Sequence, residues 1–196
     1  MERTQCLAAH VVGRVLAGRS LDSELTAVWR QQSELSPQQR GAVQDVAYGT
    51  LRHLGYVDAA IDRLLSRPLT DLPVRNLLQV TLYQLMHTKA HSYAIVNHAV
   101  PAAARLGFPK AQGLVNAVLR NFLRRRDELD AAIKATDLGR YSYPQWWIDR
   151  VAAEYPEGWR EILEAGNARP PLTLRVNRRK IARDDYLEIL RLQDIA

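Results

Sequence analysis

The sequence has few cysteines, glycines and prolines and no long apolar run, and each of these features excludes a class of protein. One cysteine, Cys6, among 196 residues excludes an internal disulfide framework and a cysteine-rich zinc site. Ten glycines and nine prolines beside 47% apolar residues exclude collagenous and long disordered chains. No apolar run approaches the ~20 residues of a membrane helix, and the N-terminus shows no signal-peptide core. We therefore expect a globular, cytoplasmic protein with no membrane partner.

Motifs for catalysis and cofactor binding are also missing. The sequence contains no G-x-G-x-x-G, Walker A, G-x-S-x-G or C-x-x-C motif. His87 and His91 have the spacing of a metalloprotease pair, but the glutamate of that motif is absent, so we interpret them as histidines at a helix end. Asp58 and Asp62 share a helix face, where such pairs are usually solvated charge. We expect no metal, no cofactor and no catalytic residue in this chain, and Cys6 is predicted to be a small core residue.

Positive charge is in excess. Lysine and arginine together number 27 against 21 acidic residues, which gives a formal charge of +6, and only four of the 27 are lysine. Arginine pairs bidentately with phosphate and stacks on bases, whereas lysine is a hydrated point charge. The composition favours a nucleic-acid partner; the alternative is a genome that simply encodes arginine in place of lysine.

Apolar residues in the first two thirds of the chain recur every three or four positions, which predicts consecutive amphipathic helices over residues 4–135. Ser36-Pro37 is a helix start, Asp71 can cap a broad, well-buried helix, and Gly107 can end the next one in a left-handed conformation. A further strong helix is predicted over 111–126. No strand pattern interrupts this half, so it is predicted to be all-α.

The pattern changes after about residue 136, where turn residues and aromatics gather, and we place a domain boundary there. Short helices are predicted over 144–154 and 157–165, one strand over 172–176 and a last helix over 183–192. A single strand cannot make a sheet. We therefore expect an all-α domain followed by a short, incomplete α/β segment whose strand lacks its partner or pairs elsewhere.

Two basic clusters are the candidate binding residues. Near the end of the 111–126 helix, Arg120 and Arg124 point away from the apolar side, as required for gripping successive phosphates. The full set of candidate RNA-binding residues is Arg120, Arg124, Arg125, Arg126, Arg175, Arg178, Arg179 and Lys180. The competing interpretations are cations that complement a helix dipole for the first four and a solvated turn for the last four.

Longer stretches resemble known families. LSPQQRGAVQDVAYGTLRHLGYVDAAIDRLL, VRNLLQVTLYQLMHTKAHSYAIVNHAV and GLVNAVLRNFLRR resemble the NusB-like RNA-binding domain, an all-helical bundle. SYPQWWIDRVAAEYP and EAGNARPPLTLRVNRR resemble the RsmB family of bacterial 16S ribosomal RNA (cytosine-5) methyltransferases. The resemblance divides the chain into a NusB-like domain, 1–135, and linker helices with the beginning of a small α/β subdomain, 136–196.

The resemblance implies an RNA-binding, substrate-positioning region that is not catalytic by itself. The RsmB family binds S-adenosylmethionine in a later domain and uses two cysteines there, and no position of this chain matches those motifs. 16S ribosomal RNA is the implied partner. Since NusB-like helices also dock a ribosomal protein in transcription antitermination, a protein-interaction module is the alternative.

Overall fold

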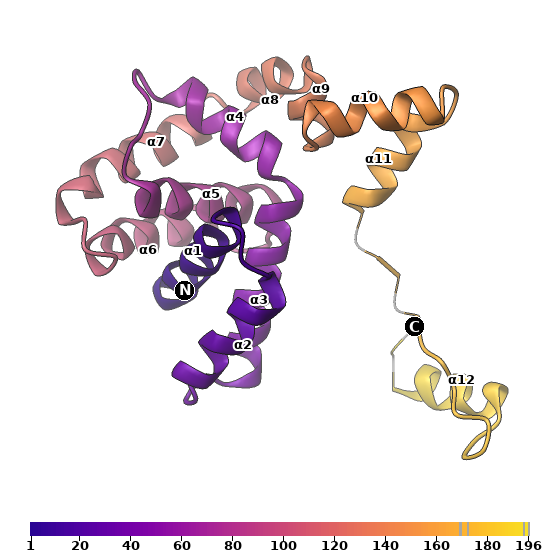
Figure 1. Cartoon of the computed structure of the whole chain (residues 1–196). Coiled ribbons are helices and arrows are strands. Elements are labelled where there is room, and N and C mark those ends of the chain that lie inside the picture. Colours follow the sequence, from indigo (N-terminus) through magenta and orange to yellow (C-terminus); the bar gives the residue numbers. More distant parts are fainter. Residues whose placement is uncertain (169, 172, 194, 196) are drawn as a thin grey trace.

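A computed structural model describes residues 1–168, 170–171, 173–193 and 195 (Figure 1). Within these ranges the chain forms α-helices and one short 3-10 helix, and no β-strand. The larger part contains α1 (Glu2–Leu16), α2 (Leu21–Gln31), α3 (Pro37–Arg52), α4 (Leu54–Leu64), α5 (Leu72–His87), α6 (Ser92–Arg105), η1 (Pro109–Ala111), α7 (Gln112–Arg124) and α8 (Arg126–Lys134). The remainder contains α9 (Asp137–Tyr141), α10 (Gln145–Glu154), α11 (Trp159–Asn167) and α12 (Arg183–Leu192).

Helix α5 is the centre of the larger part. Its residues from Leu77 to Leu85 are all buried, which confirms the well-buried helix that the broad apolar face predicts. Helices α1, α3, α4, α6 and α7 pack around it, and their apolar faces close one continuous core with it (Figure 1). Each large apolar side chain buried there contributes ~1.5–3 kcal/mol through removal from water.

Several helix ends lie where the sequence places them. Ser36 begins α3 in a capping box with Gln39, in which each side chain bonds the other residue's backbone N–H. Gly107 adopts a left-handed conformation with φ +94° just after α6. Asp71 occupies the N-cap position of α5, but its side chain makes no capping hydrogen bond. Local capping chemistry therefore defines most, but not all, of these boundaries.

One boundary differs from the prediction. Helix α7 ends at Arg124 instead of continuing to residue 126, and Arg125 leaves the helical conformation with φ −109° and ψ 21°. A new helix, α8, then begins with Asp127 and Glu128 in its first turn. Acidic side chains there interact favourably with the positive end of the helix dipole, which favours a second start over a longer α7.

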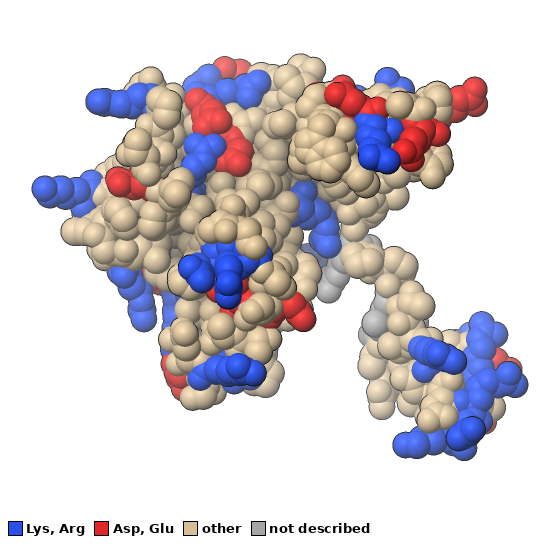
Figure 2. All heavy atoms as spheres, in the orientation of Figure 1, with Lys and Arg blue, Asp and Glu red and all other residues tan. Residues whose placement is uncertain are grey.

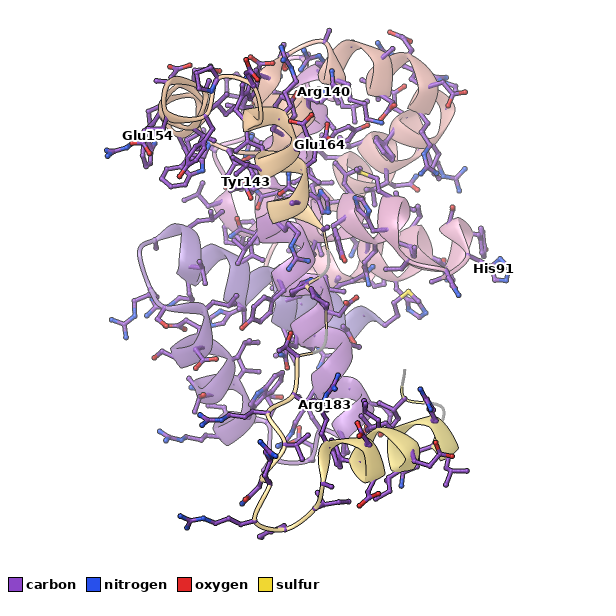
Figure 3. All side chains as sticks on the ribbon, turned by 90° about the vertical axis from the view of Figure 1, so that its right-hand side faces the viewer. His91, Arg140, Tyr143, Glu154, Glu164 and Arg183 are labelled. Atoms are coloured by element: carbon purple, nitrogen blue, oxygen red, sulfur yellow. The ribbon has the colours of Figure 1, made fainter. Side chains whose placement is uncertain are left out.

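A smaller cluster of buried residues joins α9, α10 and α11. It consists of Tyr141, Ile148, Val151 and Leu163, and the Trp159 ring packs edge-on against Tyr141 with centroids 5.3 Å apart. Arg140 and Glu164 lie 3.8 Å apart across α9 and α11 (Figure 3). These three helices form a unit with its own core.

The predicted strand is not formed in the described residues. Residues 173–177 have no regular structure, and position 172 lies outside the described residues. The reason is the missing pairing: without a second strand in the described part of the chain, these backbone groups have no ladder to join. Helix α12 follows, contains no buried residue and lies apart from the other helices (Figure 1). The α/β character expected of residues 136–196 is thus absent from what the structure describes.

None of the helices in the described ranges is both long and apolar enough to cross a bilayer.

Candidate nucleic-acid interface

A groove runs between α6 and α7 and brings two of the predicted arginines together. Its volume is about 1230 Å³. Arg120 and Arg124, both exposed, line it from α7. The complete lining is Tyr93, Val96, Asn97, Val100, Pro101, Gln112, Gly113, Asn116, Arg120, Leu123 and Arg124. We call this the α6–α7 groove.

The two arginines owe their position to the opposite face of α7. Val115, Val118, Leu119 and Phe122 are buried on that face, so residues four apart on the other side share one exposed row. Arg120 Nε donates to Asn116 Oδ1 at 3.0 Å, and Arg124 Nη2 donates to Asn121 Oδ1 at 2.9 Å. These bonds orient the guanidinium groups without neutralising them.

No carboxylate among the described residues pairs with this charge. No aspartate or glutamate lines the groove, and within the described residues neither Arg120 nor Arg124 forms an ion pair. Two uncompensated guanidinium groups one helical turn apart attract a polyanion whose charges are regularly spaced.

Helix α6 supplies the opposite wall, which the sequence analysis missed. Tyr93 is 77% exposed, and Asn97 follows it one turn later. An exposed aromatic ring can stack on a base, and the amides of Asn97, Gln112 and Asn116 can donate to and accept from base edges. The sequence signal for Tyr93 is an aromatic on the polar face of an amphipathic helix, but only the packing of α6 on α7 joins it to the arginines.

The other two arginines of the first cluster have different surroundings. Arg125 forms a bidentate ion pair with Glu128, with N···O distances of 2.6 and 3.0 Å. The pair raises the pKa of Arg125 and lowers the pKa of Glu128, mainly through its hydrogen bonds. Arg126 begins α8; partial burial and, to a smaller extent, the charge of Arg126 lower the pKa of His87. The structure therefore does not bring Arg125 and Arg126 into the groove.

The second cluster lies beyond α11. Arg175, Arg178, Arg179 and Lys180 are all exposed, and a turn at 178–180 is held by the Arg179 backbone N–H, which donates to Asn177 Oδ1 at 3.1 Å. Figure 2 shows basic side chains gathered on this part of the molecule, around α12. We call these four residues the C-terminal basic cluster. It shares no pocket with the α6–α7 groove.

The remaining sequence candidates lie outside the α6–α7 groove. Cys6 is buried in α1, where burial raises the pKa of its thiol. His91 precedes α6 and points outward at the edge of the molecule (Figure 3), whereas His87 packs against His53, so the two do not form a pair. No set of three or more potential metal ligands occurs in the described part of the chain.

Asp58 and Asp62 differ from the solvated pair that the sequence predicts. Arg75 bridges them, with N···O distances of 2.7 Å to Asp58 and 2.8 Å to Asp62. Gln79 Nε2 also donates to Asp58, at 2.9 Å. The pair is thus part of a network that fastens α4 to α5.

Two family matches divide the chain between them. Residues 2–135 match the NusB family, and residues 143–196 match the RsmF/B-like methyltransferase ferredoxin-like domain.

Curated relatives cover nearly the whole chain. The protein "Ribosomal RNA small subunit methyltransferase B" of Escherichia coli O7:K1 is 38% identical over 187 residues, which is 94% of this chain and 43% of that protein. The protein of the same name from Serratia proteamaculans is 36% identical over 193 residues, 97% of this chain and 44% of that protein. The chain thus spans about two fifths of the length of these relatives.

Proposed function

Since the chain belongs to the NusB family over residues 2–135, we propose that it binds RNA and positions it as part of an S-adenosylmethionine-dependent 16S ribosomal RNA (cytosine-5) methyltransferase. The name of its relatives and the match of residues 143–196 to a domain of such enzymes support this proposal. In this proposal the protein binds and positions ribosomal RNA in the cytoplasm. The 196 residues contain no glycine-rich nucleotide-binding loop and only a single cysteine. We therefore assign no cofactor-binding or catalytic residue to this chain.

The observation that carries the proposal is the α6–α7 groove. Arg120 and Arg124 offer uncompensated positive charge on one wall, and Tyr93 offers an exposed ring on the other. Charge for phosphates beside a stacking surface is the combination that proteins use to hold RNA.

The C-terminal basic cluster supplies a second set of phosphate contacts in this proposal. Its four cations are exposed, and the turn beside them presents them together. We assign domain 1–135 to gripping the RNA through the groove and region 136–196 to contacting the same RNA at a second point. Two separate contact points fix the orientation of a bound RNA on the protein, whereas a single contact point does not.

The experiment is the salt dependence of RNA binding for the variant Arg120→Gln with Arg124→Gln. Each phosphate contact contributes about 0.7–0.9 to the slope of log K against log salt concentration. The double variant should therefore bind a ribosomal RNA hairpin more weakly and with a slope flatter by about one to two units. Fluorescence anisotropy at several salt concentrations measures both quantities.

The matched control is Arg30→Gln with Arg67→Gln. Both residues are exposed and neither lines the α6–α7 groove, so this pair removes the same net charge away from the groove. It should leave the slope within the error of the wild type. An unchanged affinity and slope in the folded Arg120 and Arg124 variant would refute the proposal.

A protein-docking function is the second candidate, favoured by exposed tryptophans. Trp146 and Trp147 are 66% and 40% exposed at the beginning of α10, with ring centroids 5.6 Å apart. Large exposed aromatics of this kind are typical of protein interfaces. In this alternative the chain is a NusB-like antitermination module, and its partner is a ribosomal protein. Binding of such a protein together with a lack of RNA affinity would favour it.

A further inference from the structure

Three aromatic rings meet where α3 and α5 end. The centroids of His53 and His87 are 4.2 Å apart with their planes at 15°, and Tyr83 lies 5.1 Å from His87 at 25°. Tyr83 and His87 are one turn apart on α5, and His53 is the residue between α3 and α4. We call these three residues the ring cluster.

The ring cluster forms part of the wall of a pocket of about 870 Å³. Helix α3 contributes the rest of one side, and Asn167 and Pro170 lie on the other. The complete lining is Gly41, Gln44, Asp45, Tyr48, Arg52, His53, Tyr83, His87, Asn167 and Pro170. The pocket thus combines stacked rings with two amides, one carboxylate and one guanidinium.

The surroundings of the two imidazoles in this wall lower the pKa of both, which favours their neutral form. Burial, the neighbouring His87 and Arg52 lower the pKa of His53 to about 4. Partial burial and Arg126 lower the pKa of His87 as well. A neutral imidazole offers one donor and one acceptor beside its π face. The wall therefore suits an uncharged aromatic ligand.

The other ligand classes fit less well. A metal ion needs at least three ligands held close together, and within the described residues neither Asp45, His53 and His87 nor any other group forms such a set. A free inorganic anion could pair with Arg52, but it would leave the rings and amides unused and would also meet the carboxylate of Asp45. A heterocycle with its own donors and acceptors can use the rings, Gln44, Asp45 and Asn167 together.

Both sites carry a guanidinium group that can contact a phosphate. Arg124 lines the α6–α7 groove, and Arg52 lines this pocket.

We propose that this ring pocket binds the base of an unpaired nucleotide, which stacks on the ring cluster while Arg52 contacts its phosphate. The proposal rests on the proposed function, since the nucleotide belongs to the RNA held in the α6–α7 groove. Its consequence is selectivity: duplex RNA, whose bases are stacked and paired, cannot fill the pocket.

Titration with each of the four ribonucleoside 5′-monophosphates tests the pocket by itself. The five histidine imidazole signals in NMR spectra are the readout. The signals of His53 and His87 should shift in a saturable manner, while His10, His91 and His98 should not. The corresponding nucleosides, which lack phosphate, should bind more weakly, and Arg52→Gln should abolish that difference.

RNA binding by variants tests the pocket in its context. His87→Ala should weaken binding of an unpaired RNA about 5- to 100-fold, the range for removing one stacked base, and leave duplex binding unchanged. His87→Phe should restore most of the affinity, because it keeps the ring. The matched control, His91→Ala, should stay within about twofold, since His91 lines neither this pocket nor the α6–α7 groove.

Failures of the two proposals are distinguishable. Suppose that the NMR signals of His53 and His87 shift with none of the four monophosphates, while RNA binding still depends on Arg120 and Arg124. The base pocket is then refuted and the proposed function stands. If the chain binds no RNA, the proposed function fails, and the base pocket's role in RNA recognition fails with it. A tyrosine-containing peptide that shifts the two signals where monophosphates do not would overturn the base pocket in favour of a protein site.

Discussion

Gly49 of α3 provides the space in which the Tyr83 ring lies. A Cβ atom at position 49 would overlap the ring carbons and the hydroxyl of Tyr83. Tyr83 is 8% exposed, and its ring belongs to the ring cluster. The close approach of α3 to α5 therefore depends on a residue without a side chain.

We expect Gly49→Ala to lower the free energy of unfolding by about 2–3 kcal/mol, because overpacking displaces a buried ring. Gly41→Ala is the control in the same helix. Position 41 is exposed with no atom within 4 Å of an added Cβ, so alanine should stabilise by about 0.5–1 kcal/mol through helix propensity. Urea unfolding followed by circular dichroism measures both. Equal changes in the free energy of unfolding at the two positions would show that the Tyr83 ring can pack without a glycine at position 49.

At the level of residues, the sequence predicts the exposure of side chains when that exposure depends on a single helix. The exposure of Arg120 and Arg124 follows from the apolar face of α7 alone. Tyr93 and His53 were missed because their roles depend on packing between helices distant in the sequence. The Arg125 and Glu128 ion pair has the i,i+3 spacing that would have revealed it.

At the level of elements, the extended segment and α12 differ from the rest of the chain. Residues 173–177 form no ladder, and α12 buries nothing. The alternating pattern that predicted a strand is real, but a strand needs a partner, which the pattern itself does not provide. The helix predicted over 183–192 is present because helical hydrogen bonds are internal to the segment.

Amide exchange should follow this division. We expect the amides of residues 173–177 to exchange almost as fast as in an unfolded chain, and those of α12 only slightly slower, because a ten-residue helix without tertiary packing is marginal. The buried stretch of α5 should exchange slowest. Hydrogen exchange measured by NMR distinguishes the exchange rates of these three segments. Strong protection at 173–176 in the monomer would mean that this segment pairs with a strand after all.

At the level of the whole molecule, the described part of the chain has two buried clusters joined through α9. The larger cluster uses residues from α1 to α8, and the smaller one uses residues from α9 to α11. Helix α9 packs on α4 between the two parts, and there the Tyr56 backbone N–H donates to Ser142 Oγ at 3.1 Å. The arginines that line the groove belong to the first part, and the C-terminal basic cluster belongs to the second.

We therefore expect a fragment of residues 1–135 to fold by itself. Its apolar faces close on one another without the remainder, so its circular dichroism spectrum should keep the helical signal and its unfolding should stay cooperative. Its free energy of unfolding should be lower by about 1–3 kcal/mol, because α4 loses its packing against α9 together with the hydrogen bond from the Tyr56 N–H to Ser142. A fragment of residues 1–143 retains Ser142 and should recover part of that loss. RNA binding by the shorter fragment should keep its dependence on Arg120 and Arg124, with a flatter salt slope since the C-terminal basic cluster is gone. A fragment 1–135 that is unfolded, or whose RNA binding no longer depends on these two arginines, would show that the groove needs the second part of the molecule to form.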